Sequence, residues 1–455
     1  MKSLAGVPIG IWLPAALMLA TAVIAIECLQ RWDFNEYCGI FMAQIVVYGI
    51  AAWALLKPSA DTRMHGRRAL IAILVVAAML RLIALFAPVY LSSDAYRYVW
   101  DGRVQAAGIN PYRYIPADPQ LSFLRDESIY PNINRADYAH TIYPPTSQLS
   151  FYVFERISDS VIGMKLGMFA FDGLSIACLL VLLRDRALPA TRVLLYAWHP
   201  LPIWEFAGMG HVDAIAIALL LLSFLFAARH APIWTGIALG AATLVKYYPI
   251  IAAPAVYRRW DWRMPLAAIA TMALLYLPYI GEGTGVLGFM PGSVNEEGLR
   301  SGSGFFLWAL LQSAVHQPAN AIRYYVPFAA LVMGALAVWV QFSRSRIPQD
   351  TSGVRATYVL ASAFTVLFSP HNAWYFAWLV PFLCFRFSLA HLWLTGICVL
   401  IYVYPNPFGL DLHLLLYMPF ILLLLIQYGL TRLRANVGNH LPERVDVEPV
   451  QRHFS

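Results

Sequence analysis

The stretch ALIAILVVAAMLRLIALFAPVYL occupies residues 69–91 and is almost entirely apolar. A helix of that length can cross the roughly 30 Å of hydrocarbon in a bilayer. The loop before it contains one acidic residue, Asp61, and four basic residues: Lys57, Arg63, Arg67 and Arg68. Because short loops rich in Lys and Arg stay in the cytoplasm, we expect 69–91 to be a transmembrane helix that leads outward.

Similar apolar runs recur along the whole chain, in which only 13% of the residues are charged. A soluble domain usually carries about 25%. The runs lie near 8–27, 37–56, 69–91, 161–183, 192–207, 212–228, 232–256, 265–281, 321–342, 354–369, 373–388, 391–404 and 413–430. The sequence therefore predicts an all-α, polytopic transmembrane bundle of about twelve spans, with both termini cytoplasmic. Residues 1–433 form one transmembrane domain, with outer loops at 92–147 and 282–320, and 434–455 form a cytoplasmic polar tail.

One segment, 232–256, breaks the alternation of sides. Arg229 precedes it and Arg258, Arg259 and Arg263 follow it, so both of its ends carry cytoplasmic signals. A proline, Pro249, interrupts the apolar run shortly after Lys246. We expect a re-entrant helical hairpin with Lys246 near its tip, since irregular backbone at that depth must be buried in protein or face a watery cavity.

Several other classes of function find no support in the sequence. The net charge of +7 fits basic cytoplasmic loops, and no basic stripe with interleaved aromatics indicates nucleic-acid binding. The five cysteines form no C-x-x-C pair, although Cys28 and Cys38 flank one short loop, which leaves a disulfide between them open. Hydrolase, zinc-protease and nucleotide-triphosphatase motifs are absent from the sequence.

The most distinctive polar sequence, SSDAYRYVWDGRVQAAGINPY, begins the first outer loop at residues 92–112. Ser93 or Asp94 can cap a helix and Gly108 can end it. On that helix one face carries Asp94, Arg97, Tyr98, Asp101 and Gln105. The segment predicts a helix along the membrane surface with two carboxylates roughly 10 Å apart. The alternative is structural: Asp94 as a cap, and Arg97 and Asp101 as a solvated face.

Further ionisable residues fall near the outer ends of other segments. They include His211 and Asp213, Arg300 in the second outer loop, and His371 with Asn372. Lys246 is interpreted as the only one of the four lysines inside a long apolar run. An unpaired intramembrane lysine is costly and therefore marks a candidate site. The alternative is that Lys246 extends its ammonium to the interface.

These motifs together resemble a known family. Ser93-Asp94-Ala95-Tyr96-Arg97 through Arg103, with Gly108-Ile109-Asn110-Pro111-Tyr112, resembles the first outer loop of GT-C class glycosyltransferases. The similarity is greatest to bacterial polyprenyl-phosphate-mannose-dependent mannosyltransferases and to the catalytic subunits of GPI mannosyltransferases. Further similar motifs follow in the same order: Tyr143-Pro144-Pro145-Thr146, Gly210-His211-Val212-Asp213, Lys246-Tyr247-Tyr248-Pro249 and His371-Asn372-Ala373-Trp374-Tyr375.

The resemblance implies an inverting transferase in the bacterial plasma membrane. It would move a hexose, most simply mannose, from a polyprenyl-phosphate donor to a lipid or glycan acceptor on the outer face. Asp94 maps to the expected catalytic base, and the implied substrate-binding residues are Arg97, Asp101, Arg103, Tyr143, His211, Asp213, Lys246, Tyr247, Arg300, His371 and Asn372. Asp94-Ala95-Tyr96 departs from an Asp-x-Asp pair, which leaves open whether Mg²⁺ or Mn²⁺ takes part.

Two other classes of function remain as alternatives. A transporter or lipid-glycan flippase would use the same intramembrane charges as a substrate path. The long first outer loop and the lack of inverted repeats count against it. An assembly protein without catalysis is a third interpretation, and the sequence does not define the oligomeric state.

Overall fold

A computed structural model describes residues 9–57, 66–314, 321–344, 352–370, 372–403 and 411–439. Within these ranges every regular element is a helix, which confirms the predicted all-α class. The α-helices are α1 Ile9–Gln30, α2 Phe34–Leu56, α3 Arg67–Leu85, α4 Asp94–Ala106, α5 Pro145–Ile157, α6 Val161–Asp185, α7 Leu194–Ala197, α8 Pro200–Pro202, α9 Asp213–Ala228, α10 Pro232–Thr243, α11 Ala253–Val256, α12 Arg263–Tyr276, α13 Met290–Glu296, α14 Phe306–Ala314, α15 Ile322–Arg344, α16 Val354–Phe368, α17 Val380–Leu383, α18 Leu389–Ile397 and α19 Leu412–Asn439.

The remaining helical segments are short 3₁₀ turns and one π-helix. The 3₁₀ segments are η3 Pro119–Leu124, η4 Tyr130–Asn132, η5 Ala190–Val193, η7 Tyr248–Ala252, η8 Leu277–Leu287, η10 Ala373–Leu379 and η11 Cys398–Tyr402, and the π-helix is η6 Ile203–Gly208. The predicted tail, 434–455, continues α19 as far as Asn439, and its remainder lies outside the described residues.

Seven helical segments are long and apolar enough to cross a membrane, or up to eight if one bent pair counts as a span. The predicted number of about twelve is therefore not confirmed. The clearest correction concerns 192–207, which is no single span but a series of short helices ending in η6, bent by 120° from α9. Pro200 and Pro202 lack the N–H that a continuous helix would need there.

This broken segment runs through the centre of the protein. Nearly every residue from 193 to 218 is buried. That burial meets the requirement that interrupted backbone at membrane depth be covered by protein. Three ionisable residues at or next to the break are buried in the interior: Glu205, His211 and Asp213.

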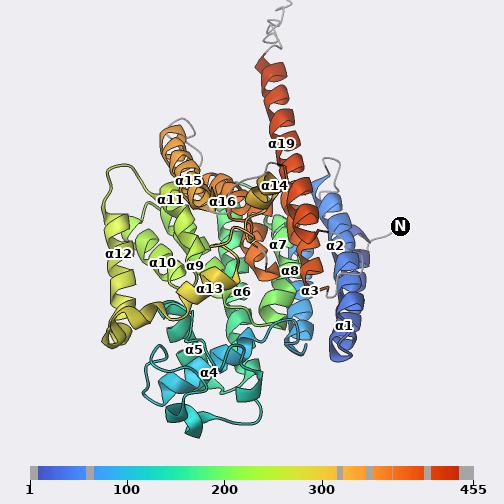
Figure 1. The fold of residues 1–455 in the computed structure, drawn as a ribbon. Helices are drawn as coiled ribbons and strands as arrows, with labels where there is room; N and C mark the ends of the chain where they lie inside the picture. Colours follow the sequence, from blue (N-terminus) through green and yellow to red (C-terminus); the bar gives the residue numbers. More distant parts are fainter. Residues whose placement is uncertain are drawn as a thin grey trace, which may run out of the picture.

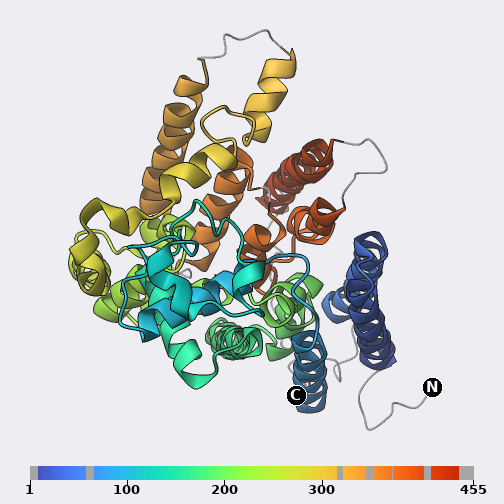
Figure 2. The same cartoon turned by 60° about the horizontal axis from the view of Figure 1, so that its bottom comes forward.

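The long helices stand side by side, and the first outer loop covers one end of them (Figure 1). Helix α4 lies across that end, packed on α5 and α6. Figure 2 turns the outer-loop end of the bundle toward the viewer. The first outer loop lies in front of the central helices, and α1 and α2 lie to one side of it. The second outer loop closes onto the first through Arg113–Glu282 at 2.8 Å and Arg135–Glu296 at 2.7 Å.

The segment 232–256 folds back on itself. At its open end, His230 before α10 contacts Arg258 after α11. At its tip, the Thr146 backbone N–H and the Ser147 hydroxyl donate to the carbonyls of Leu244 and Val245, at 2.9 and 2.8 Å. The tip therefore meets the start of α5, at the outer-loop end. That this hairpin is re-entrant in a bilayer stays a prediction.

A buried ion pair that was not predicted from the sequence fixes the centre of the bundle. Arg81 of α3 pairs with Asp172 of α6, and both side chains are almost fully buried. The Tyr196 hydroxyl donates to Asp172 at 2.6 Å, and Arg81 also donates to the Ala197 carbonyl at 2.7 Å. Three elements, α3, α6 and α7, are thereby tied together. No disulfide joins Cys28 and Cys38, because both are free, buried thiols.

Candidate active site

Asp94 is the first residue of α4 and is partly buried below the first outer loop. The backbone N–H of Asp94 is capped by the Ser92 hydroxyl, and the Asn134 amide donates to the Asp94 carboxylate at 3.0 Å. Helix α4 ends at Ala106, and Gly108, the predicted terminating residue, follows its cap with a φ of +75°. Asp94 is thus oriented by the loop and needs no role as the cap.

Two tyrosines connect Asp94 to the interior. Tyr98 and Tyr143 pack edge to face with ring centroids 4.9 Å apart. Burial raises the pKa of Tyr98 well above its ordinary value, and the carboxylates of Asp94 and Asp213 raise it further. Burial and then Asp94 likewise raise the pKa of Tyr143. Both carboxylates therefore lie within electrostatic range of one tyrosine, although Asp94 and Asp213 are far apart in the sequence.

The hairpin tip brings Lys246 to Asp213. The Lys246 ammonium donates to Asp213 at 2.6 Å and lies over the Tyr375 ring, 4.8 Å from its centroid. The Asp213 side chain is 1% exposed, whereas that of Lys246 is 15% exposed. One Asp213 oxygen has no hydrogen-bond partner among the residues that the structure describes. An ammonium has three donors, so Lys246 can bind Asp213 and still present a cation outward.

A second buried acid, Glu205, binds His211, which precedes Asp213 by two residues. Glu205 of η6 accepts from the Tyr402 hydroxyl at 3.1 Å and contacts His211 Nδ1 at 2.8 Å. The His211 ring stacks on Trp374 with centroids 4.2 Å apart. His211 is fully buried, and within the described part of the chain its other nitrogen has no hydrogen-bond partner. The bond to Glu205 therefore holds the His211 imidazole against Trp374, which precedes Tyr375 in the chain.

A cavity of about 300 Å³ opens beside Lys246. Lys246, Tyr247 and Tyr248 of the hairpin tip line one part, together with Tyr143 of the first outer loop. Ile142 and Pro144 flank Tyr143 on the wall, and the rest comes from the second outer loop and from α16, η10 and the residues between them: Met290, Ser293, Glu297, Leu299, Phe364, Phe368, Pro370 and Tyr375. The Tyr375 hydroxyl donates to Glu297 at 3.1 Å. The cavity is therefore mostly apolar, and among the described residues that line it Lys246 is the one cation and Glu297 the one carboxylate.

A known family covers Asp94, the pair of Asp213 and Lys246, and the part of the cavity wall that comes from the first outer loop and the hairpin tip. The sequence model of the MptA_B family, described as alpha-(1->6)-mannopyranosyltransferase, N-terminal domain, matches residues 3–261. This chain belongs to that family. No curated protein and no solved structure matches the chain. Together with its membrane-length helices, the match identifies a membrane mannosyltransferase and confirms the resemblance inferred from the motifs.

Three predicted site residues of the mannosyltransferase bind other parts of the protein. Arg97 donates to Asp101 at 2.9 Å, and Asp101 also accepts from Gln148 and Thr141. Arg97 and Asp101 are both buried. Arg103 pairs with Asp126 and Asp159, at 2.9 and 2.6 Å. These contacts fasten α4 to the outer loop and to the turn before α6.

The other predicted residues are distributed around the cavity. Three of them line it: Tyr143, Lys246 and Tyr247. Asp213 pairs with Lys246, and His211 stacks on Trp374, next to Tyr375 of the cavity wall. Arg300 is exposed and follows Leu299 of the cavity wall. Asn372 precedes η10, where its carbonyl accepts from the Tyr375 backbone N–H. His371 lies outside the described residues.

Several residues of this region in the mannosyltransferase were not predicted from the sequence. Glu205 and Lys165 both lie in apolar runs, and an ionisable residue in such a run is itself a signal. Lys246 is therefore not the only intramembrane lysine: Lys165 of α6 is 1% exposed and donates to the Ala87 carbonyl at 2.8 Å. Glu297 and Asn134 sit in polar loops and carry no comparable signal.

A divalent cation finds no obvious ligand set here. Within the described part of the chain, no three His, Cys, Asp or Glu side chains gather as metal ligands would. Asp94 is already bound to Asn134, and Asp213 is already bound to Lys246. No step of the reaction is therefore assigned to a metal ion, and the question whether Mg²⁺ or Mn²⁺ takes part is left to experiment.

Proposed function

We propose that this mannosyltransferase uses a mannosyl polyprenyl phosphate as donor and transfers mannose on the outer face of a bacterial plasma membrane. The acceptor is a lipid or glycan hydroxyl, and the family's name suggests that the product linkage is α-(1→6). The observation that carries the proposal is the mostly apolar cavity that Lys246 and Tyr143 both line, with Tyr143 within electrostatic range of Asp94.

The cavity supports a lipid-linked donor over a nucleotide sugar. Phe364, Phe368 and Leu299 give it an apolar wall suited to isoprene units. Lys246 supplies a cation for the phosphate at the end of that lipid. A nucleotide would need polar partners for its base and ribose, whereas polyprenyl phosphate needs only an apolar groove and a phosphate site.

In the proposed reaction the acceptor hydroxyl oxygen attacks the anomeric carbon of mannose. Asp94 takes the hydroxyl proton as the new C–O bond forms. The bond from the anomeric carbon to the phosphate oxygen breaks, and its electron pair stays on the phosphate. Lys246 stabilises that charge, with Asp213 holding the ammonium in place. A single displacement inverts the anomeric centre, so an α-linked product requires a β-linked donor.

Three charged residues of α4 make no substrate contact in this proposal, because their charges are paired within the protein: Arg97, Asp101 and Arg103. Tyr247 and Arg300 remain as residues beside the donor's path. His211, held by Glu205 and Trp374, acts through the η10 segment and is a positioning residue.

A donor comparison tests this proposal. Purified protein in detergent is given an acceptor and either radiolabelled mannosyl polyprenyl phosphate or radiolabelled GDP-mannose. We expect labelled product from the lipid donor only. Product from GDP-mannose would contradict the proposal. Movement of the intact lipid across a vesicle membrane without cleavage of the sugar–phosphate bond would instead support the flippase alternative.

A further inference from the structure

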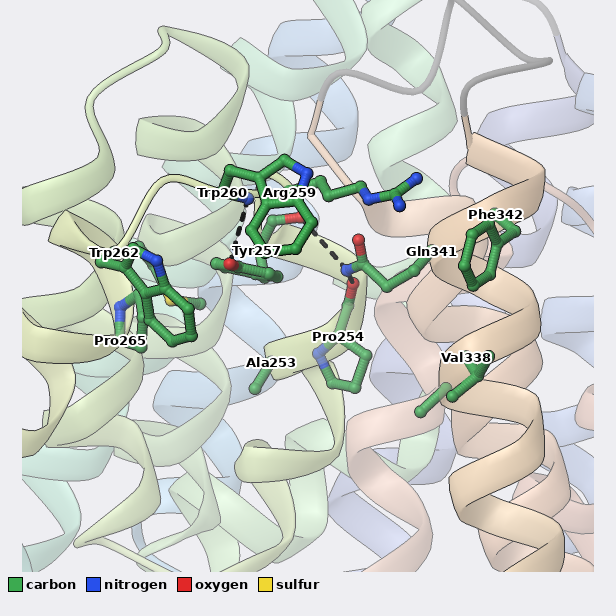
Figure 3. Close-up of a pocket in the computed structure, with 12 residues that line it drawn as sticks. Ala253, Pro254, Tyr257, Arg259, Trp260, Trp262, Pro265, Val338, Gln341 and Phe342 are labelled. Carbon is green, nitrogen blue, oxygen red and sulfur yellow. Dashed lines mark hydrogen bonds between the residues drawn. The ribbon is translucent and has the colours of Figure 1, made fainter.

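A second and larger cavity, of about 590 Å³, lies away from the proposed active site. It is formed between the turn that joins α11 to α12 on one side and α15 on the other (Figure 3). Helix α12 begins at this cavity and leads into η8, which contacts the first outer loop through Tyr279 and Asn110. Because α12 is roughly 20 Å long, the two cavities lie toward opposite ends of the bundle.

Polar groups gather at one end of this cavity. The Arg259 guanidinium lies 5.5 Å from the Trp260 ring centroid and 5.0 Å from that of Phe342. Gln341 donates to the carbonyls of Pro254 and Tyr257, which holds α15 against the turn. Below these groups the cavity is bounded by apolar side chains, including Ala253, Pro265 and Val338 (Figure 3).

The turn beside the cavity carries a net positive charge. It holds Arg258, Arg259 and Arg263 against one acid, Asp261. Arg263 binds both carboxylate oxygens of Asp261 at 2.8 Å, so this acid is already engaged by another arginine. The exposed Trp260 and Trp262 are the aromatic residues typical of a membrane–water interface.

The surfaces next to the cavity are those of lipid-facing helices. Leu266 and Ile269 of α12, and Val338 and Trp339 of α15, are all more than half exposed. Apolar side chains this exposed on membrane-length helices are suited to contact with acyl chains. A ligand that enters between α12 and α15 therefore comes from the bilayer, and its polar end meets Arg259.

We propose that this cavity binds an anionic phospholipid. One acyl chain fills the apolar part between α12 and α15, and the headgroup phosphate pairs with Arg259 at the interface. Charge complementarity selects the anionic lipid: Arg259 lines the polar end, in a turn that carries three arginines and one acid, whereas the other walls are mostly apolar. Basic pockets between transmembrane helices bind anionic headgroups by this chemistry. The site is separate from the proposed donor cavity and does not depend on its assignment.

Native mass spectrometry of the full-length protein in detergent tests the proposal. The probes are dioleoyl phosphatidylglycerol and dioleoyl phosphatidylcholine, titrated separately. We expect phosphatidylglycerol to bind more tightly, and Arg259→Gln to weaken its binding about fivefold while leaving phosphatidylcholine unchanged. Val338→Trp, which places a large side chain in the apolar part, should weaken the binding of both lipids.

Arg67→Gln is the matched control. Arg67 is exposed at the start of α3, at the same end of the bundle, and does not line the cavity. It should leave the affinity for phosphatidylglycerol unchanged. Equal affinity for the two lipids in the wild type, unaltered phosphatidylglycerol binding in Arg259→Gln, or an equal loss in Arg67→Gln would each overturn the proposal.

Discussion

At the scale of single residues, the structure separates two aspartates that the sequence places on one helix face. Asp94 is partly buried and bound by one amide, whereas Asp101 is fully buried and satisfied by Arg97, Thr141 and Gln148. A carboxylate that must accept a proton from a substrate needs access to it. The partly exposed Asp94 is the candidate that meets this requirement, whereas the contacts of Asp101 are structural.

Replacing Asp94 by asparagine tests the base. The side-chain oxygen of the new amide can still accept from Asn134, so the fold should persist while transfer falls about 100-fold or more. The measurement is the initial rate of mannosyl transfer, with thermal unfolding as a check on folding. Asp137→Asn, at an exposed position of the same loop, is the control and should transfer normally. Near-wild-type turnover in Asp94→Asn would remove Asp94 from the mechanism.

Lys246→Met tests the phosphate contact, because methionine fills similar volume without charge. We expect the donor KM to rise at least about tenfold, since a charge-assisted contact to phosphate is lost. The substitution also leaves Asp213 buried and unpaired, so Lys246→Met/Asp213→Asn is needed to separate this effect from folding. Lys246→Arg should keep part of the affinity. An unchanged donor KM in the double variant would reduce Lys246 to an interfacial anchor.

At the scale of elements, the sequence predicted several helices correctly but did not predict the contacts between distant segments. The apolar runs at 8–27, 37–56, 69–91 and 161–183 correspond closely to α1, α2, α3 and α6. The bounds of α4 were also predictable, because capping residues and Gly108 act locally. The partners of Asp101 were not, since Thr141 and Gln148 reach it only through the fold of a long loop. Nor did hydropathy reveal that 192–207 would break into short helices around Glu205.

The hairpin of α10, η7 and α11 makes a topological prediction. Single cysteines introduced at Ala231 and Trp260, in a background without the five native cysteines, should react with an impermeant reagent from the same side of sealed vesicles. A cysteine at Asp137 on the first outer loop should react from the opposite side. Labelling of positions 231 and 260 from opposite sides would show that the segment is a full span and would reverse every later helix.

The pair of Arg81 and Asp172 predicts how three elements depend on one another. Arg81→Met leaves Asp172 buried without its cation, which should destabilise the protein by roughly 3–5 kcal/mol. Arg81→Met/Asp172→Leu removes both charges and should recover much of that loss. Thermal unfolding in detergent measures both. A double variant no more stable than the single one would show that the contacts of Asp172 with Tyr196 matter more than the charge pairing.

At the scale of the whole molecule, the candidate active site lies at one end of the bundle and an arginine-rich turn lies at the other. The first outer loop, the hairpin tip and the second outer loop meet at the end that holds Asp94 and Lys246. The turn with Arg258, Arg259 and Arg263 lies at the other. This division fits a protein that receives a lipid-linked sugar on one face and is anchored by basic residues at the other.

The most direct test of the central claim is the fate of the anomeric carbon in a single reaction. Mannosyl polyprenyl phosphate with a β linkage and ¹³C at the anomeric carbon is converted by the purified protein, and NMR of the product gives configuration and linkage. Direct displacement predicts an α-(1→6) mannoside and one free polyprenyl phosphate for each mannose transferred. A product that keeps the β configuration, or mannose transfer without release of polyprenyl phosphate, would contradict a direct displacement at the Asp94 and Lys246 site.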